Sequence, residues 1–360
     1  MRSRNTGIKT AWGLIDAEML GKGRSLAIYV LGSTLTSTIP NISLAGQMPL
    51  ATLFTPALDA EYVYYGEPIS LDIIPTTPTG IPTPAIITRV SLELSKQSYL
   101  FIDAGSYIEP KIPLIQLRNR RVGDRIDLRD ALPKGASEKL FKESRELIER
   151  LGRGVDAVLI GESIPAGTTT AMAILRAFGF EAEDLVSSSM KNNPLDLKKS
   201  VVDKAIKRIR DQGDPFHIND VVGDPVHITI AGLVSGAMRN NSLVILAGGT
   251  QMLAVIALLK AIDGSRLERV VLATTKWIMK DRGDKIIGFI KKIAPEISVA
   301  YSDLGFEDSP HEGLRAYEEG YVKEGVGAGG TSLLAMAKGV DRDHLIRSIY
   351  REYERIMGRI

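Results

Sequence analysis

The stretch VLIGESIPAGTTTAMAILRAFG, residues 158–179, decides the fold prediction. It begins with apolar residues that end at Gly161-Glu162, which is typical of a strand buried on both faces of a sheet. A Gly-Thr-Thr-Thr run at residues 167–170 then opens an Ala-rich segment of helical character. A buried strand that leads directly into a helix is the repeating unit of a parallel sheet, so the stretch predicts a β-turn-α unit.

The same alternation recurs along the chain. Further apolar runs predict buried strands at residues 25–31, 99–103, 243–247, 270–273 and 298–301. Segments of helical periodicity are found at residues 84–96, 138–151, 197–210, 250–262 and 284–293. The predicted fold class is therefore α/β, with a parallel Rossmann-like sheet flanked by helices and ligands bound at the carboxyl ends of the strands.

The two ends of the chain are expected to lie apart from this sheet. Residues 342–357 place apolar side chains at three- and four-residue spacings, which predicts an amphipathic helix with one stripe to bury. We expect a large α/β nucleotide-binding domain over residues 25–340. Residues 1–24 and 341–360 are expected to form a small helical subdomain or a dimer arm.

Composition excludes several kinds of site. Lys and Arg total 45 against 43 Asp and Glu, so the net charge of +2 provides no strong field for nucleic acid or an anionic membrane. The sequence has no cysteine, which excludes disulfides, thiolate nucleophiles and cysteine-ligated metals. The four histidines show no metal-ligand spacing, so no metal site is predicted. No cofactor is predicted either.

Neither secretion nor a membrane span is predicted. The amino-terminal segment lacks a continuous apolar core and a small-residue cleavage pattern. The most apolar window, residues 243–262, is long enough for a membrane span, but Gly248-Gly249-Thr250-Gln251 divide it into a strand-like and a helix-like half. We therefore expect a cytoplasmic protein without membrane contact.

The helix start at residues 167–170 is a candidate anion site. Unpaired N–H groups at a helix start, with three hydroxyls beside them, suit a phosphate or a carboxylate. A threonine that simply caps the helix is an equally good interpretation. The spacing of a P-loop is not met, because no Lys follows Gly167.

A second glycine-rich stretch, EEGYVKEGVGAGGTSLLAMAKG, covers residues 318–339. Gly325, Gly327 and Gly330 satisfy G-x-G-x-x-G, but a charged segment precedes them where a dinucleotide site needs a hydrophobic strand. Glu324 stands immediately before these glycines. If its carboxylate were buried, its pKa would rise toward neutrality and suit it to accept a proton. An exposed Glu is the alternative, and the pattern alone favours it.

A third segment is basic. Lys191 lies in a loop before a helix whose first turn carries Lys198 and Lys199. Cations at a helix start oppose the helix dipole, so an anionic ligand would explain them. A solvated basic face explains them equally well.

The order of these motifs resembles the nicotinate-nucleotide:dimethylbenzimidazole phosphoribosyltransferase superfamily, in its divergent archaeal-type branch. The motifs run from about residue 156 to residue 338, and the branch-like resemblance extends through GSTLTSTIPNISLAG, TPALDAEY and GIPTPAIITR. The resemblance implies that the protein is an enzyme, that it forms a homodimer, and that its substrates are nicotinate mononucleotide and an aromatic base.

The resemblance also implies roles for individual residues. Glu324 matches the general base, and Glu162 matches an early carboxylate of the site. The residues that would bind substrate are Gly161, Gly167, Thr168, Thr169, Lys191, Lys198, Gly325, Gly327 and Ser43. Lys198 matches a phosphate contact, with Lys199 as a close second, and Ser43 would face the base.

The reaction that the resemblance implies is displacement at the anomeric carbon of nicotinate mononucleotide by a base nitrogen. Nicotinate leaves, and inversion produces an α-ribotide for assembly of the cobamide lower ligand. The loop GESIPAGTTT is one residue longer than in the bacterial family, and the segment that lines the base pocket matches little. A different acceptor base, or a non-catalytic nucleotide-binding protein, therefore remains an alternative. A dinucleotide-dependent oxidoreductase would bind NAD or NADP and so show a raised melting temperature.

Overall fold

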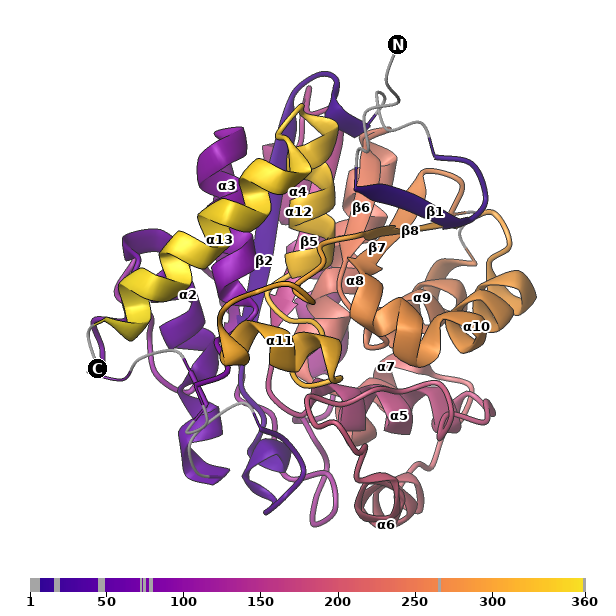
Figure 1. Ribbon diagram of the computed structural model, residues 1–360. Helices are drawn as coiled ribbons and strands as arrows, with labels where there is room; N and C mark the ends of the chain where they lie inside the picture. The colour runs from indigo at the N-terminus through magenta and orange to yellow at the C-terminus, as the bar shows by residue number, and fades with distance from the viewer. Residues whose placement is uncertain are drawn as a thin grey trace.

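The computed structural model describes residues 7–15, 20–44, 49–71, 73, 76–77, 80–264 and 267–358. Within these residues a single sheet holds the strands in the order β1-β8-β7-β6-β5-β2-β3-β4 (Figure 1). Their bounds are β1 (Ile8–Trp12), β2 (Ser25–Gly32), β3 (Tyr99–Gly105), β4 (Ile115–Gln116), β5 (Ala157–Ser163), β6 (Leu243–Ala247), β7 (Val270–Thr275) and β8 (Ser298–Ser302). Neighbouring strands run parallel except β1, which pairs antiparallel with β8. The α/β class and the parallel sheet are thus confirmed.

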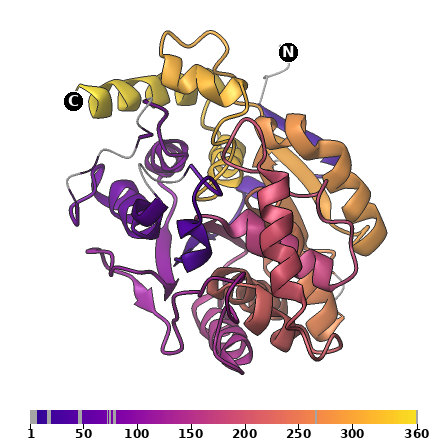
Figure 2. The ribbon, with the colours of Figure 1, turned by 90° about the horizontal axis from the view of Figure 1, so that it is seen from below.

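Helices cover both faces of the sheet, as the view from below shows (Figure 2). The apolar layer on one face includes residues of α4 (Ala136–Leu151), α5 (Gly167–Ala177), α6 (Leu195–Ile206), α7 (Pro215–Val222), α8 (Pro225–Arg239), α9 (Met252–Asp263) and α10 (Lys276–Ile293). The layer on the other face includes residues of α2 (Thr55–Tyr65), α3 (Ala85–Ser95), α11 (Glu312–Glu318), α12 (Ala328–Ala337) and α13 (Arg342–Met357). Successive strand residues point to opposite faces, so Val158 and Ile160 join the first apolar layer and Leu159 the second.

The connections reverse direction between β2 and β5. From β2 the chain continues outward through β3 and β4, whereas from β5 it continues the other way through β6, β7 and β8. In open parallel sheets, such a switch point opens a crevice at the carboxyl ends of the two central strands. Two short 3-10 helices, η1 (Leu35–Thr38) and η2 (Pro49–Leu53), follow β2 on this side.

The second glycine-rich stretch serves close packing of α12 on the sheet. A Cβ at Gly330 would lie 2.4 Å from Cβ of Ala247, and one at Gly329 would lie 2.1 Å from the backbone carbon of Thr274. The element before this stretch is α11, not a strand. The glycines therefore have a packing role, and the structural context of a dinucleotide fingerprint is missing, as predicted.

We expect Gly330→Ala to destabilise the protein by about 1–3 kcal/mol, the usual cost of overpacking a core. The added methyl group meets Ala247 at a distance that real Cβ contacts do not show. Gly288→Ala in α10 is the matched control, because a Cβ there meets nothing within 4 Å and alanine favours helix. Denaturant unfolding of both variants checks this, and equal stabilities would contradict the packing role.

The chain ends differ from the expectation in one respect. Ile8–Trp12 is an edge strand of the main sheet, because its backbone pairs with β8, while α13 has the bounds predicted and packs with α3 against the second layer. Residues 1–6, 16–19 and 359–360 lie outside the described residues. Division into a large domain and a small helical arm stays a prediction.

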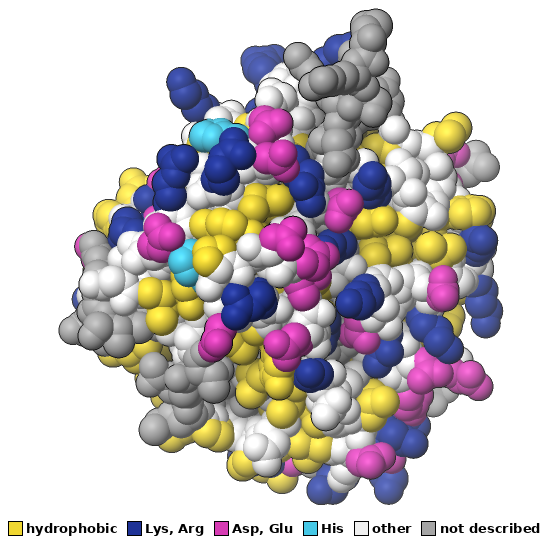
Figure 3. All heavy atoms as spheres, in the orientation of Figure 1, with side chains coloured by type: hydrophobic (Ala, Val, Ile, Leu, Met, Phe, Trp, Pro, Cys, Tyr) yellow, Lys and Arg dark blue, Asp and Glu magenta, His cyan; other side chains and the backbone are white. Residues whose placement is uncertain are grey.

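Basic and acidic side chains are interspersed on the face seen in Figure 3, as expected from the small net charge. Among the described residues, no helix combines the length and apolarity that a membrane crossing needs.

Candidate functional site

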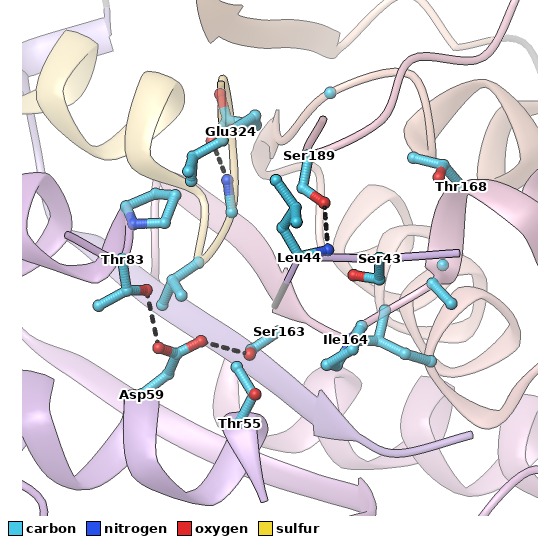
Figure 4. Close-up of a pocket in the computed structure, with 18 of the residues that line it drawn as sticks. Ser43, Leu44, Thr55, Asp59, Thr83, Ser163, Ile164, Thr168, Ser189 and Glu324 are labelled. Atoms are coloured by element: carbon cyan, nitrogen blue, oxygen red, sulfur yellow. Dashed lines mark hydrogen bonds between the residues drawn. The ribbon is translucent and has the colours of Figure 1, made fainter. Parts of the chain in front are cut away.

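A cavity of about 360 Å³ lies beyond the carboxyl ends of β5 and β6, beside the switch point. The turns that follow these strands line it, together with α2, the loop before α12 and the segments after β2. In Figure 4, Asp59 and Thr83 lie toward one end of the cavity and Thr168 toward the other. Its position is the one predicted for ligands in a parallel sheet.

Glu324 lies on the cavity wall, in the loop between α11 and α12. The N–H of Gly329 donates to both carboxylate oxygens at 3.2 Å, and the Thr274 hydroxyl donates to Oε2 at 3.4 Å. Burial raises the pKa of Glu324 to about 7, and these hydrogen bonds oppose the rise. The carboxylate therefore exchanges a proton near neutral pH, which is the requirement for a general base.

The loop that carries Glu324 has a strained backbone. Val322, Lys323 and Val326 have φ of 61°, 48° and 51°, in the left-handed region that β-branched residues avoid. Tertiary hydrogen bonds hold it: the N–H of Val326 donates to the carbonyl of Glu162 at 2.8 Å, and the Thr275 hydroxyl donates to the carbonyl of Lys323 at 2.6 Å. Strain fixed in this way is concentrated at functional sites, where it keeps a side chain in one position.

Two further carboxylates line the cavity. Glu162, at the end of β5, is 2 % exposed, and burial together with the charge of Glu324 raises its pKa well above the ordinary value. Asp59 of α2 accepts hydrogen bonds from the hydroxyls of Ser163 and Thr83, each at 2.8 Å (Figure 4). Burial raises the pKa of Asp59 to about 6. The described residues that line the cavity include no Lys, Arg or His, so the cavity is acidic.

The amino terminus of α5 faces the opposite end of the cavity. Ala166 is its N-cap, with φ of 62°, and no side chain caps the helix. The capping interpretation of the threonines therefore does not hold: Thr168 lines the cavity and Thr170 donates to Asp224. The positive end of the helix dipole and the Thr168 hydroxyl leave this helix start suited to an anion.

Lys198 lies behind this helix start rather than on the cavity wall. Its side chain is fully buried, and its Nζ donates to Oγ1 of Thr168 at 2.9 Å and to the carbonyl of Ser187 at 2.7 Å. The exposed neighbour Lys199 is directed elsewhere by the helical turn. Of the two lysines, Lys198 is the one connected to the cavity.

The charges around Lys198 are mostly positive. Burial, with smaller contributions from the charges of Lys323 and Arg282, lowers its pKa to about 7, whereas Asp281 opposes the decrease. Such a group takes up a proton when an anion arrives, because the anion stabilises the ammonium form. The cluster thus has the electrostatics of a phosphate subsite.

The remaining predicted residues divide into two sets. Ser43, Gly167 and Gly325 line the cavity. The others lie elsewhere: Gly161 and Gly327 pack against each other, Thr169 is fully buried, and Lys191 forms an exposed pair with Glu319 at 3.4 Å.

Two cavity residues were missed from the sequence. Asp59 lies in TPALDAEY, which has no helical periodicity to mark its face. Gln251 ends the Gly-Gly-Thr-Gln turn after a predicted strand, and that position at a carboxyl end was the signal available for it. Among the described residues, no group of three or more His, Asp or Glu is placed to hold a metal ion.

Comparison with known proteins identifies a family and a fold. A model of a phosphoribosyltransferase family matches residues 93–273. Two crystal structures from Thermus thermophilus have the same fold at 15 % identity, each covering 93 % of this chain. One, described as a nicotinate-nucleotide-dimethylbenzimidazole phosphoribosyltransferase, has a TM-score of 0.58 over 83 % of its length, and the other, described as CobT, has 0.59 over 86 %.

Two sequence relatives are archaeal proteins. A UPF0284 protein of Aeropyrum pernix is 48 % identical over 94 % of both chains. One of Saccharolobus solfataricus is 42 % identical over 92 % of this chain and 93 % of its own. The family resemblance is thereby confirmed: the chain belongs to the nicotinate-nucleotide:dimethylbenzimidazole phosphoribosyltransferase family, in the branch of the archaeal UPF0284 proteins.

Proposed function

We propose that this protein transfers the phosphoribosyl group of nicotinate mononucleotide to dimethylbenzimidazole or a related azole base. The products are nicotinate and an α-ribotide for the cobamide lower ligand. The observation that carries the proposal is Glu324, a carboxylate with a pKa of about 7 on the wall of a cavity in a phosphoribosyltransferase-family chain.

The charge of the cavity fits such a donor. In nicotinate mononucleotide the ribose is joined to a pyridinium cation, and this positive charge moves toward the sugar as the bond breaks. Asp59, Glu162 and Glu324 surround the cavity without a basic residue among the described lining residues. Carboxylates placed around a developing positive charge lower the energy of the transition state.

The phosphate fits the other end. Gly167 and Thr168 at the start of α5 line the cavity, and the Lys198 ammonium lies behind the Thr168 hydroxyl. A helix amino terminus carries about half a positive charge, so it and the ammonium act in the same direction on a phosphate.

The reaction needs one proton acceptor. One nitrogen of the base attacks the anomeric carbon while the bond to nicotinate breaks, and the bonding pair stays on the ring nitrogen, which leaves uncharged. The proton on the other nitrogen of the base passes to Glu324. Attack from the face opposite the leaving group inverts the configuration. Proton removal makes the base a better nucleophile as its charge develops.

The acceptor is proposed to lie against apolar side chains of the cavity, which include Ile42, Leu44, Ile73 and Ile81. An aromatic ring fits such a surface. Ser43 keeps its proposed place facing the base. A different azole or purine base fits the same surface and is the alternative acceptor.

A cytoplasmic homodimer is part of the proposal. Tyr64 and Tyr65 at the end of α2 are 40 % and 47 % exposed, and we propose that these exposed aromatic side chains contribute to the contact between the two copies. Sedimentation across a range of concentrations measures the assembly.

Incubation with nicotinate mononucleotide and dimethylbenzimidazole, followed by mass spectrometry, tests the proposed reaction. Free nicotinate together with a new ribotide is the expected result. Nucleotide binding without either product, when other azoles and purines are also tried, indicates the non-catalytic alternative. Absence of nucleotide binding contradicts the proposal.

We expect kcat/KM to show a bell-shaped pH dependence with a maximum near neutrality. Glu324 must be ionised to accept a proton, so its pKa of about 7 sets the acid limb, on which the rate falls as pH decreases. Lys198 must be protonated to attract the phosphate, so its pKa of about 7 sets the alkaline limb. Steady-state kinetics across this range, repeated with Lys198→Met, checks the assignment: that variant should lose the alkaline limb alone.

A further inference from the structure

Two hydrogen bonds and an ion pair form a continuous chain of contacts from the cavity into the core behind Glu162. Nε2 of Gln251 donates to Oε1 of Glu162 at 3.0 Å, and Oε1 of Gln251 lies 3.0 Å from Nε2 of His227. Nδ1 of His227 lies 2.8 Å from Oδ2 of Asp224. His227 and Asp224 are both fully buried, so solvent does not provide alternative partners for this chain.

The inner end of the chain is held rigidly. Asp224 is the N-cap of α8, and its Oδ1 accepts from the N–H groups of Val226 and His227 at 2.9 and 2.8 Å. Its Oδ2 also accepts from the hydroxyl of Thr170. A carboxylate surrounded by donors stays ionised, and the charge of His227 lowers the pKa of Asp224 further, although burial opposes this.

The direction of each hydrogen bond sets the protonation of the histidine. The Gln251 amide donates to Glu162 through its nitrogen, so its oxygen must accept from Nε2 of His227. Nδ1 is in ion-pair contact with Oδ2 of Asp224, an ionised oxygen that can only accept, so Nδ1 must also carry a hydrogen. Both ring nitrogens then carry hydrogen, and the ring is an imidazolium. Burial opposes this charge, but Asp224 outweighs it and raises the pKa of His227.

The carboxylate form of Glu162 is favoured because both of its oxygens accept hydrogen bonds, Oε1 from Nε2 of Gln251 and Oε2 from the N–H of Ile164 at 3.1 Å. Burial and the charge of Glu324 act the other way and raise the pKa of Glu162. The amide can reverse only if a proton is removed from His227 and one is placed on Glu162. The protonation of Glu162 is thus tied to that of His227.

We infer that Gln251, His227 and Asp224 form a relay of positioning residues that holds Glu162 in place as a carboxylate facing the positive charge of the donor. The inference rests on the proposed function for the donor but on the structure alone for the imidazolium. Two anions, Glu162 and Asp224, then lie on either side of one buried cation, the imidazolium of His227. The net negative charge that remains lies on the side of Glu162, which lines the cavity.

Nitrogen-15 NMR of the histidine side chains tests the relay without any turnover. The chain has four histidines, and loss of one signal in His227→Gln assigns His227. At about pH 7.5, one unit above the ordinary histidine pKa, both nitrogens of His227 should be protonated. In Glu162→Gln the signal should move toward the neutral ring, which a histidine that only supports α8 would not do. A neutral ring in the unaltered protein overturns the relay.

Kinetics of His227→Gln provides the second measurement. Loss of an outer partner at metal sites costs about 10–100-fold in activity, and we expect a fall in kcat of this order with little change in KM for the nucleotide. His217→Gln in α7 is the matched control, because its ring accepts from the N–H of Arg210, outside the relay. An unchanged kcat in His227→Gln overturns the inference. Inactivity of the unaltered protein with a protonated His227 would reject the proposed function but leave the relay standing.

Discussion

Replacement of Glu324 by Gln is expected to lower turnover at least ~100-fold, the usual contribution of one general base. The amide keeps the size of the side chain and leaves the N–H of Gly329 an oxygen to donate to, so the fold and the nucleotide site should persist. What disappears is the group whose pKa of about 7 allows it to accept the proton of the base. Single-turnover rates with nicotinate mononucleotide measure the effect.

The control for this variant is Glu319→Gln. Glu319 stands in the same loop, but its side chain is 57 % exposed and pairs with the exposed Lys191. Its replacement should leave the rate unchanged, since an exposed ion pair contributes little. Full activity of Glu324→Gln would remove Glu324 from the mechanism, and calorimetry of nucleotide binding distinguishes a lost base from a lost site.

Replacement of Lys198 by Met should weaken binding of nicotinate mononucleotide by about 10–100-fold. A hydrogen bond to a charged group contributes about 1.5–3 kcal/mol, and each 1.4 kcal/mol is a tenfold change in affinity. The methionine retains the apolar stem in the core and removes the ammonium behind Thr168. Binding of the corresponding riboside, which lacks the phosphate, should be little affected.

Two observations complete this test. Lys199→Met, on the adjacent exposed position, should bind the nucleotide normally. Because the pKa of free Lys198 is about 7 and a bound phosphate raises it, binding slightly above neutral pH should take up protons, and this uptake should vanish in Lys198→Met. Calorimetry in buffers of different ionisation enthalpy measures the uptake. An equal loss of affinity for nicotinate mononucleotide and for the riboside would mean that Lys198 only supports the local structure.

Regular secondary structure with a clear pattern was predictable from the sequence. The strand Leu243–Ala247 and the helix Arg342–Met357 have the predicted bounds, because one is a short apolar run and the other a single apolar stripe. The helix α8 was not predicted, since its residues are buried almost all round and leave no period to detect. The edge strand β1 depends on its partner β8, which lies far along the chain.

The motifs located the site but not the orientation of its side chains. Thr168 and Thr169 are adjacent and equally suited to an anion by pattern, yet one lines the cavity and the other points into the core. The same holds for the lysines of α6, where only Lys198 is turned inward. A helix turns its side chains by about 100° per residue, so the packing of α5 and α6 decides which neighbour reaches the cavity.

By itself, the sequence determined the α/β class, the family and the two glutamates on which the proposed chemistry depends. Three features follow from the fold alone: the burial that raises the pKa of Glu324 to about 7, the place of Asp59 on the cavity wall, and the position of His227 behind Glu162. The pKa of a side chain and the direction of its hydrogen bonds depend on the groups around it. Here those groups come from α2, β5, α8 and α9, which are brought together by the sheet and not by the order of residues.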